Sequence, residues 1–81
     1  MFYTYVLYSP IFKKFYKGQT EDLNIRLKQH NSGRVKSTKA YTPWEIVHYE
    51  EYEQRKEALQ RERYFKTAAG RRFLKTKINL Q

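Results

Sequence analysis

Residues 2–20 read FYTYVLYSPIFKKFYKGQT, and this stretch decides the fold. Residues 2–8 are β-branched and aromatic, which is typical of a strand, and a Ser-Pro pair ends the run. A second aromatic run, residues 14–19, closes around Gly18. Because the connection is short and consecutive strands usually pair, we expect an antiparallel hairpin.

Helices and one more strand are expected after the hairpin. Thr20 stands where a helix N-cap would, ahead of two acidic residues, and the first helix is expected to end near His30. Residues 34–43 are polar and basic without a period, which predicts a loop. The remaining expected elements are a strand over residues 44–49 and helices over residues 54–67 and 71–78, with Gly70 as the break between these helices.

Length and composition favour one small folded domain. The chain has 81 residues, and its eight tyrosines and one tryptophan add apolar bulk to a small core. The order β-β-α-β-α-α predicts an α+β fold, a three-stranded antiparallel sheet flanked by helices, in a single domain over residues 1–81. The absence of cysteine excludes disulfides and thiolate metal sites. With no signal peptide and no apolar run near the ~18 residues of a membrane span, we expect a cytoplasmic protein.

The charge balance indicates a polyanionic partner. Seventeen Lys and Arg face eight Asp and Glu, for a formal net charge of +9. Residues 23–43 carry five basic residues and no acid, and residues 55–81 carry nine with two acids. Such a chain most often contacts nucleic acid. The cations expected to meet phosphates are Arg34, Lys36 and Lys39 in the predicted loop and Arg71, Arg72, Lys75 and Lys77 near the C-terminus.

A carboxylate interrupts the apolar stripe of the predicted 54–67 helix. At 100° per residue, Ala58, Leu59 and Phe65 define the stripe, and Glu62 falls between Ala58 and Phe65. A bare charge that faces the body of a domain is unfavourable, so this carboxylate must be neutralised, paired or bound to a cation. Two interpretations stay open: an ion pair with Arg55 or a lysine, or a metal ligand.

Two polar residues border the apolar side of the first predicted helix. Leu23 and Leu27 mark that side, and Arg26 and His30 lie four residues apart beside it. Their side chains either snorkel toward solvent or point together over the sheet.

Tyrosines form a third group. Tyr3 and Tyr5 share one face of the first strand, and Tyr16 lies on its expected partner strand. One interpretation is ordinary core packing. The other is convergence of phenol, guanidinium, imidazole and carboxylate on one sheet face, which is the set of groups needed for metal-assisted phosphodiester hydrolysis.

The order and spacing of these residues resemble the GIY-YIG nuclease family. The matching positions are Tyr3-Thr4-Tyr5 for Gly-Ile-Tyr, Tyr16-Lys17-Gly18 for Tyr-Ile-Gly, then Arg26, His30 and the Ala-x-x-x-Glu pattern from Ala58 to Glu62. The resemblance spans residues 2–67. The chain is similar to the small single-domain members of the family and to the catalytic domain of the nucleotide-excision-repair incision subunit. The chain departs from the motifs at Tyr3, Thr4 and Lys17, and Asn79 is not assigned to the family's downstream asparagine.

The resemblance implies a DNA endonuclease of repair or processing that hydrolyses one strand with a single divalent cation, Mg²⁺ or Mn²⁺. Glu62 would hold the metal and Arg26 would clamp the phosphate. Tyr16 or Tyr5 would orient or deprotonate the attacking water. A free phenol, with a pKa of about 10, is a poor base at neutral pH.

Help for that phenol would come from Lys17 or His30, or His30 would act as the base itself. The expected partner is DNA, structured or damaged, in a cytoplasmic or nucleoid-associated setting, and the pattern favours no particular oligomeric state. One alternative is a non-catalytic nucleic-acid-binding module that retains the nuclease fold. Another is a basic accessory of an RNA-containing assembly.

Overall fold

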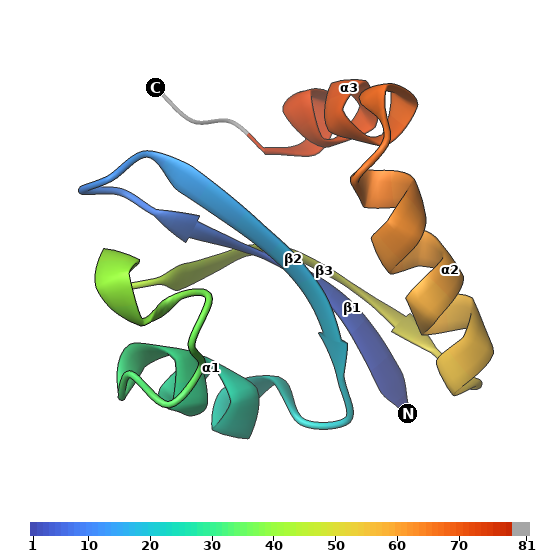
Figure 1. Ribbon diagram of the computed structural model, residues 1–81. Coiled ribbons are helices and arrows are strands. Elements are labelled where there is room, and N and C mark those ends of the chain that lie inside the picture. The colour runs from blue at the N-terminus through green and yellow to red at the C-terminus, as the bar shows by residue number, and fades with distance from the viewer. Residues whose placement is uncertain (79–81) are drawn as a thin grey trace.

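An antiparallel sheet with helices on both of its faces makes up the molecule (Figure 1). The computed structural model describes residues 1–78. The order of elements confirms the predicted α+β class and the β-β-α-β-α-α arrangement. The elements are β1 (Phe2–Ser9), β2 (Lys14–Thr20), α1 (Leu23–Asn31), a short 3-10 helix η1 (Lys39–Tyr41), β3 (Glu45–Tyr52), α2 (Arg55–Phe65) and α3 (Ala68–Lys77).

The first strand of the chain is the central strand of the sheet. The strand order is β2-β1-β3, and both pairings are antiparallel. Tyr5 of β1 lies opposite Gly18 of β2 and Tyr49 of β3. Because successive side chains of a strand point to opposite faces, the buried run from Thr4 to Leu7 contributes to two separate cores.

The two cores place different helices on the two faces of the sheet. One core comprises Tyr5, Leu7 and Trp44, with Leu23 and Leu27 of α1 packed against it. The other comprises Val6, Phe65 of α2 and Leu74 of α3. The edge strand β2 therefore lies between α1 on one side and the α2–α3 pair on the other (Figure 1).

Thr4 fixes α2 to the central strand. This side chain is fully buried, and its hydroxyl donates a 2.7 Å hydrogen bond to the Ala58 carbonyl. Glu62 lies one helical turn beyond Ala58, so the same bond sets the position of that carboxylate. The departure from isoleucine at this motif position thus adds a polar anchor that a hydrocarbon side chain lacks.

The start of α1 differs from the prediction. Asp22, not Thr20, is the N-cap, and its carboxylate accepts a 3.0 Å hydrogen bond from the Ile25 amide. Thr20 is the last residue of β2, and its hydroxyl accepts from the Asp22 amide at 3.2 Å. The N-cap prediction was wrong because the strand continues further than its aromatic pattern, and the cap moves along with it.

The interpretation of Gly70 as a helix break was also wrong. Thr67 is the N-cap of α3, and its hydroxyl accepts a 3.1 Å hydrogen bond from the Gly70 amide. Gly70 is buried inside the first turn, where a Cβ would overlap the carbonyl of Tyr64. The glycine therefore serves close packing between α3 and the end of α2. Asn79 lies outside the described residues, and no helix among residues 1–78 is long and apolar enough to cross a membrane.

Candidate active site

A buried phenol and a buried imidazole meet between β1 and α1. The Tyr5 hydroxyl lies 3.0 Å from Nε2 of His30, and Nδ1 of His30 lies 2.7 Å from Oγ1 of Thr38. Both His30 and Thr38 are fully buried. Burial, followed by the nearby Arg26 charge, lowers the pKa of His30 to about 4, so the imidazole is neutral at neutral pH.

The hydrogen bonds around Tyr5 assign the direction of each proton. Nε of Arg26 donates to the Tyr5 hydroxyl at 3.4 Å, and a guanidinium can only donate. The phenol proton therefore points to Nε2 of His30, and the neutral ring carries its own proton on Nδ1. That N–H donates to Thr38, whose hydroxyl donates in turn to the Val35 carbonyl at 3.3 Å.

The hydrogen bond between Arg26 and Tyr5 affects the pKa of both groups. Burial raises the pKa of the Tyr5 phenol, and the hydrogen bond from Arg26 only partly opposes this. The same hydrogen bond raises the pKa of the Arg26 guanidinium. A second bond, 3.0 Å from Arg26 to Oε1 of Gln29, orients the guanidinium further. At neutral pH the site thus holds a neutral phenol beside a fixed cation.

Tyr16 is the more accessible of the two motif phenols. It is half-buried, whereas Tyr5 is 2 % exposed. Its ring centroid lies 4.9 Å from the His30 ring and 6.3 Å from the Tyr5 ring. Its hydroxyl lies close to the Arg26 guanidinium, and this contact helps to raise the pKa of Arg26. Tyr16 is therefore the motif phenol that a substrate or a water molecule can reach.

Gly18 allows Tyr5 to reach across the edge strand. An added Cβ at this position would lie 2.6 Å from the Tyr5 hydroxyl oxygen and 3.1 Å from the Tyr16 ring. No side chain fits there, so the Tyr5 phenol lies over the backbone of β2. This brings the phenol toward the edge of the sheet, against which α2 also packs.

Glu62 of α2 forms an ion pair with an exposed partner. Oε2 of its carboxylate lies 3.0 Å from Nζ of Lys66. The Glu62 side chain is 20 % exposed and that of Lys66 is 55 % exposed. The partner is therefore a lysine and not Arg55. An exposed i,i+4 pair contributes only about 0.3–0.5 kcal/mol, so it leaves the carboxylate available to a stronger cation.

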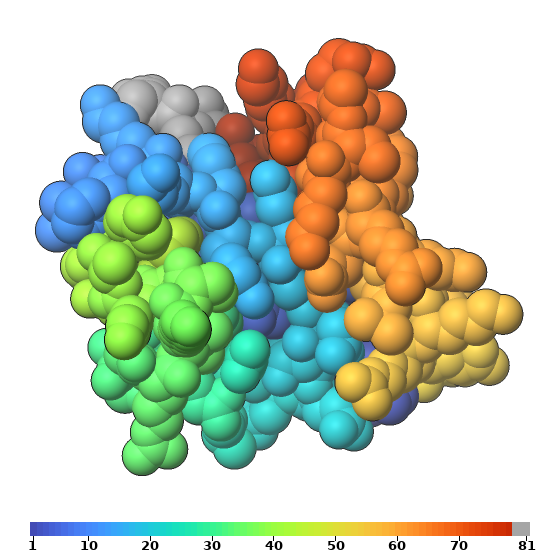
Figure 2. Space-filling view, in the orientation of Figure 1, coloured from blue at the N-terminus to red at the C-terminus, as the bar shows by residue number. Residues whose placement is uncertain are grey.

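The two sides of the site interact across β2. The negative charge of Glu62 contributes to the raised pKa of Tyr5, although the two side chains make no direct hydrogen bond. Figure 2 shows β2 at the surface between the α1 side and the α2 side, where the face is hollowed. A cavity of about 330 Å³ lies between α1 and the first residue of α2, and Arg26 is the candidate catalytic residue in its lining. The lining residues are Gln19, Thr20, Glu21, Arg26, Gln29 and Arg55.

The predicted phosphate-contacting cations lie in two groups outside this region. Arg34, Lys36 and Lys39 are exposed on the segment that follows α1, and Arg71, Arg72, Lys75 and Lys77 are exposed on α3. Lys17 alternates with Tyr16 and Gly18 along β2 and so points to the opposite face, where it lines a cavity with Arg71. The structure therefore does not bring Lys17 to the phenols that it was expected to assist.

Sequence reasoning missed the residues that hold the loop in place. The Asn31 side chain bonds both the amide and the carbonyl of Trp44, at 2.6 and 3.0 Å. The Trp44 indole donates to the carbonyl of Thr38 at 2.9 Å, which fixes Thr38 against His30. The loop has no periodic apolar pattern that would predict these contacts. The large aromatic residue at its end, Trp44, was the one feature of the sequence that pointed to an anchor.

The single carboxylate of Glu62 suits a hard cation that takes few of its ligands from the protein. Within residues 1–78 no three His, Asp or Glu side chains cluster as a metal site would require. Glu62 offers a single carboxylate with one oxygen outside its ion pair. Mg²⁺ keeps several waters and often takes only one or two carboxylates plus substrate phosphates, so Glu62 fits this ion and not a fully protein-ligated one such as structural zinc.

Residues 1–79 match the GIY-YIG catalytic domain, and the chain belongs to this family. Members of this family are endonucleases that generally depend on divalent metal ions.

Curated relatives agree with this assignment. The chain is 43% identical over 53 residues to the UPF0213 protein YazA of Bacillus subtilis, covering 64% of this chain and 54% of the relative. It is 46% identical over 52 residues to a UPF0213 protein of Bacillus velezensis, covering 63% and 52%, and 42% identical over 53 residues to one of Listeria welshimeri, covering 64% and 59%. The match thus spans about half the length of these relatives. No solved structure matches.

Proposed function

We propose that this chain is a metal-dependent DNA endonuclease that hydrolyses one strand, with Mg²⁺ or Mn²⁺ as cofactor and structured or damaged DNA as substrate. In this proposal residues 1–81 act as one nuclease domain in DNA repair or processing, either in the cytoplasm at large or in association with the nucleoid. The observation that supports it most is the hydrogen-bonded set of Arg26, Tyr5 and His30, next to an accessible Tyr16 and within charge range of Glu62.

Arg26 is the proposed phosphate clamp. Its guanidinium is held by Tyr5 and Gln29 but remains partly accessible, so free N–H groups can donate to a phosphate oxygen. A charged, preorganised donor of this kind stabilises the negative charge that develops on a phosphate in the transition state.

Tyr16 is the proposed proton acceptor for the attacking water, because it is the accessible phenol of the pair. Tyr5 and His30 are too buried to reach a substrate, so we assign them to positioning: His30 fixes Tyr5, and Tyr5 fixes Arg26.

Glu62 is the proposed metal-holding residue. Its partner Lys66 is exposed, and so is easily displaced by a divalent ion. When bound, the ion supplies positive charge that stabilises the leaving oxygen of the phosphodiester.

The test is a cleavage assay on nicked, branched and plain DNA with Mg²⁺ or Mn²⁺, and with EDTA as a control. We expect metal-dependent strand scission that Glu62→Gln and Arg26→Ala abolish. The matched control is Glu53→Gln, which removes an exposed carboxylate just before α2. If the protein binds DNA but cleaves none of the three DNA forms with either metal ion, the result would instead support a non-catalytic binding module.

A further inference from the structure

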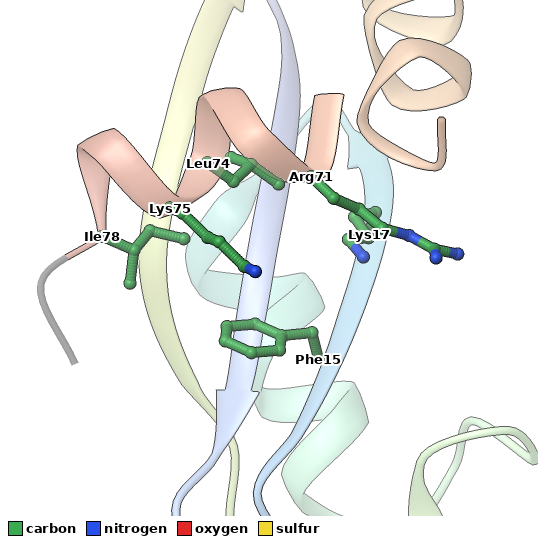
Figure 3. Close-up of a pocket in the computed structure, with 6 residues that line it drawn as sticks. All are labelled: Phe15, Lys17, Arg71, Leu74, Lys75 and Ile78. Carbon is green, nitrogen blue, oxygen red and sulfur yellow. The ribbon is translucent and has the colours of Figure 1, made fainter. Parts of the chain in front are cut away.

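A second cavity lies between β2 and α3, on the sheet face opposite Tyr16. Its volume is about 500 Å³, within the range of roughly 300–1,000 Å³ that is usual for small-ligand sites. We call it the α3 groove. Its lining residues are Phe15, Lys17, Arg71, Leu74, Lys75 and Ile78 (Figure 3).

The groove combines an apolar interior with a cationic rim. Figure 3 shows the Phe15 ring facing the space under α3, with Leu74 and Ile78 projecting from the helix side. Phe15 is 45 % exposed, although its ring centroid lies 4.9 Å from that of Tyr8, so one part of the ring is supported and another is open. An aromatic ring held in this way is a preformed stacking surface.

The positive charge of the rim is not compensated. No acidic residue lines the cavity, and among residues 1–78 none of Lys17, Arg71 and Lys75 takes part in an ion pair. Burial lowers the pKa of the Lys17 ammonium, and the charges of Arg71 and Lys66 lower it further. Three unpaired cations around an apolar slot are complementary to a ligand that has a flat apolar part and a nearby anion.

The groove is electrostatically continuous with the proposed active site. Lys66, which pairs with Glu62, is one of the charges that act on Lys17, and Lys17 lines the groove. A DNA strand whose phosphates contact Lys66 and Lys17 would pass from the proposed active site to Phe15. A nucleotide can enter the apolar slot only if its base is unpaired, because a paired base presents no free face for stacking.

We propose that the α3 groove binds one unpaired nucleotide of the DNA substrate, with its base stacked on Phe15 and its phosphate held by Lys17, Arg71 and Lys75. This inference rests on the proposed function for the source of the strand, and it narrows the substrate to DNA that has unpaired nucleotides beside the cleavage site. Stacking would add affinity without base preference, since every base has an apolar face.

The test measures binding in EDTA, so that it does not depend on cleavage. Three labelled ligands are used: a duplex with a single-stranded extension, the same molecule with abasic nucleotides in the extension, and a blunt duplex. We expect Phe15→Ala to weaken binding of the first ligand by roughly 10-fold or more and to leave the other two within about two-fold. Phe12→Ala is the matched control, because Phe12 is 47 % exposed on the β1–β2 connection and does not line the groove.

A conservative variant guards against a folding defect. Phe15→Trp keeps a stacking surface, so it should bind the extended duplex at least as tightly as the parent. Its indole fluorescence should change only with the ligand whose single-stranded extension carries bases. Equal losses on all three ligands for Phe15→Ala, or no loss on any, would overturn the groove assignment. Discrimination by Phe15 in a protein that cleaves nothing would support the groove while refuting the nuclease proposal.

Discussion

The Tyr5 hydroxyl lies against the backbone of Gly18, at a distance that leaves no room for a methyl group. The conformation of a site residue thus depends on the absence of a side chain on the neighbouring strand. The glycine of the second motif is required by this close approach and not by an unusual backbone angle, because a positive φ among the glycines is found only at Gly33 within residues 1–78.

Gly18→Ala should therefore damage the site more than the fold. The new methyl would displace the Tyr5 phenol and with it the hydrogen bonds to His30 and Arg26, because a Cβ there would approach the hydroxyl to 2.6 Å. We expect cleavage to fall by about 10²-fold, as for a misplaced catalytic group, and stability to fall by about 1–3 kcal/mol. Cleavage rates and urea unfolding measure the two effects.

Gly33→Ala is the matched control for this change. Gly33 has a φ of +79°, and a new Cβ there would lie 3.9 Å from the Cβ of Lys39, which is ordinary van der Waals contact. Alanine at this position strains the backbone by about 1–2 kcal/mol without touching the site. Loss of cleavage in Gly33→Ala similar to that in Gly18→Ala would mean that activity simply follows stability.

Thr38→Val tests the assigned tautomer of His30. Valine has nearly the same shape but removes the acceptor for the Nδ1 proton of His30. A buried donor left without a partner lowers the free energy of unfolding by about 1–3 kcal/mol. His30 would then favour the other tautomer, and Nε2 could no longer accept the Tyr5 proton. We expect a lower kcat with DNA affinity unchanged, an altered pH–rate profile, and recovery in Thr38→Ser. A parent-like pH–rate profile in Thr38→Val would show that Thr38 only fills space.

The buried imidazole predicts a specific loss of stability in mild acid. The folded protein holds the pKa of His30 at about 4, against 6.5 in the unfolded chain. Between these two values the unfolded chain binds a proton that the folded protein does not, so the free energy of unfolding decreases as the pH falls from about 6.5 to about 4. The total decrease is on the order of 3 kcal/mol.

His30→Gln should remove that dependence, as judged from urea unfolding at several pH values. Glu50 provides an internal contrast. Burial opposes its ionisation, but hydrogen bonds from Arg61, Tyr52 and His48 outweigh burial and lower its pKa to about 2. Its contribution to stability is present above pH 4.5 and disappears only as the pH falls toward 2. An unchanged slope between pH 6.5 and 4 in His30→Gln would contradict the assignment to His30.

Glu62→Gln separates a structural carboxylate from a metal-holding one. Its ion pair with Lys66 is exposed, so the substitution should change stability by no more than about 0.5 kcal/mol. DNA binding should be equal or tighter, because a negative charge that faces the phosphates is removed, and cleavage should be lost. Lys66→Ala breaks the same pair and should remain active. An unfolded Glu62→Gln protein, or one that cuts at the parent's rate, would refute this role.

The exposed cations after α1 predict a salt-dependent affinity. If Lys36 and Lys39 each neutralise one phosphate, the logarithm of the affinity should fall linearly with the logarithm of salt concentration between about 50 and 200 mM. The double variant Lys36→Gln, Lys39→Gln should lower the magnitude of this slope by about 2. An unchanged slope in the double variant would place the DNA elsewhere.

Local sequence determined the elements and supplied the residues that are proposed for the site. The aromatic runs of β1 and β2, the amphipathic spacing of α1 and α2, and the misfit of Glu62 on its apolar stripe are all short-range patterns. For that reason the order of elements was predicted correctly. Glu62 pairs with Lys66, which agrees with one of the two interpretations that its position left open. The predicted boundaries failed at Thr20 and Gly70, where the identity of a cap depends on where the neighbouring element ends.

Only the tertiary structure decided which polar groups meet. The partnership of His30 with Thr38 joins a helix to an aperiodic loop, and that loop is placed by Asn31 and Trp44 through contacts that no local pattern encodes. Lys17 and Tyr16 point to opposite faces of the sheet because side chains alternate along a strand. Lys17 lines a cavity only because α3 covers the face to which it points. Hydrogen bonds and cavities are set by distances between residues far apart in the chain, so they become defined only when the helices pack on the two faces of the sheet.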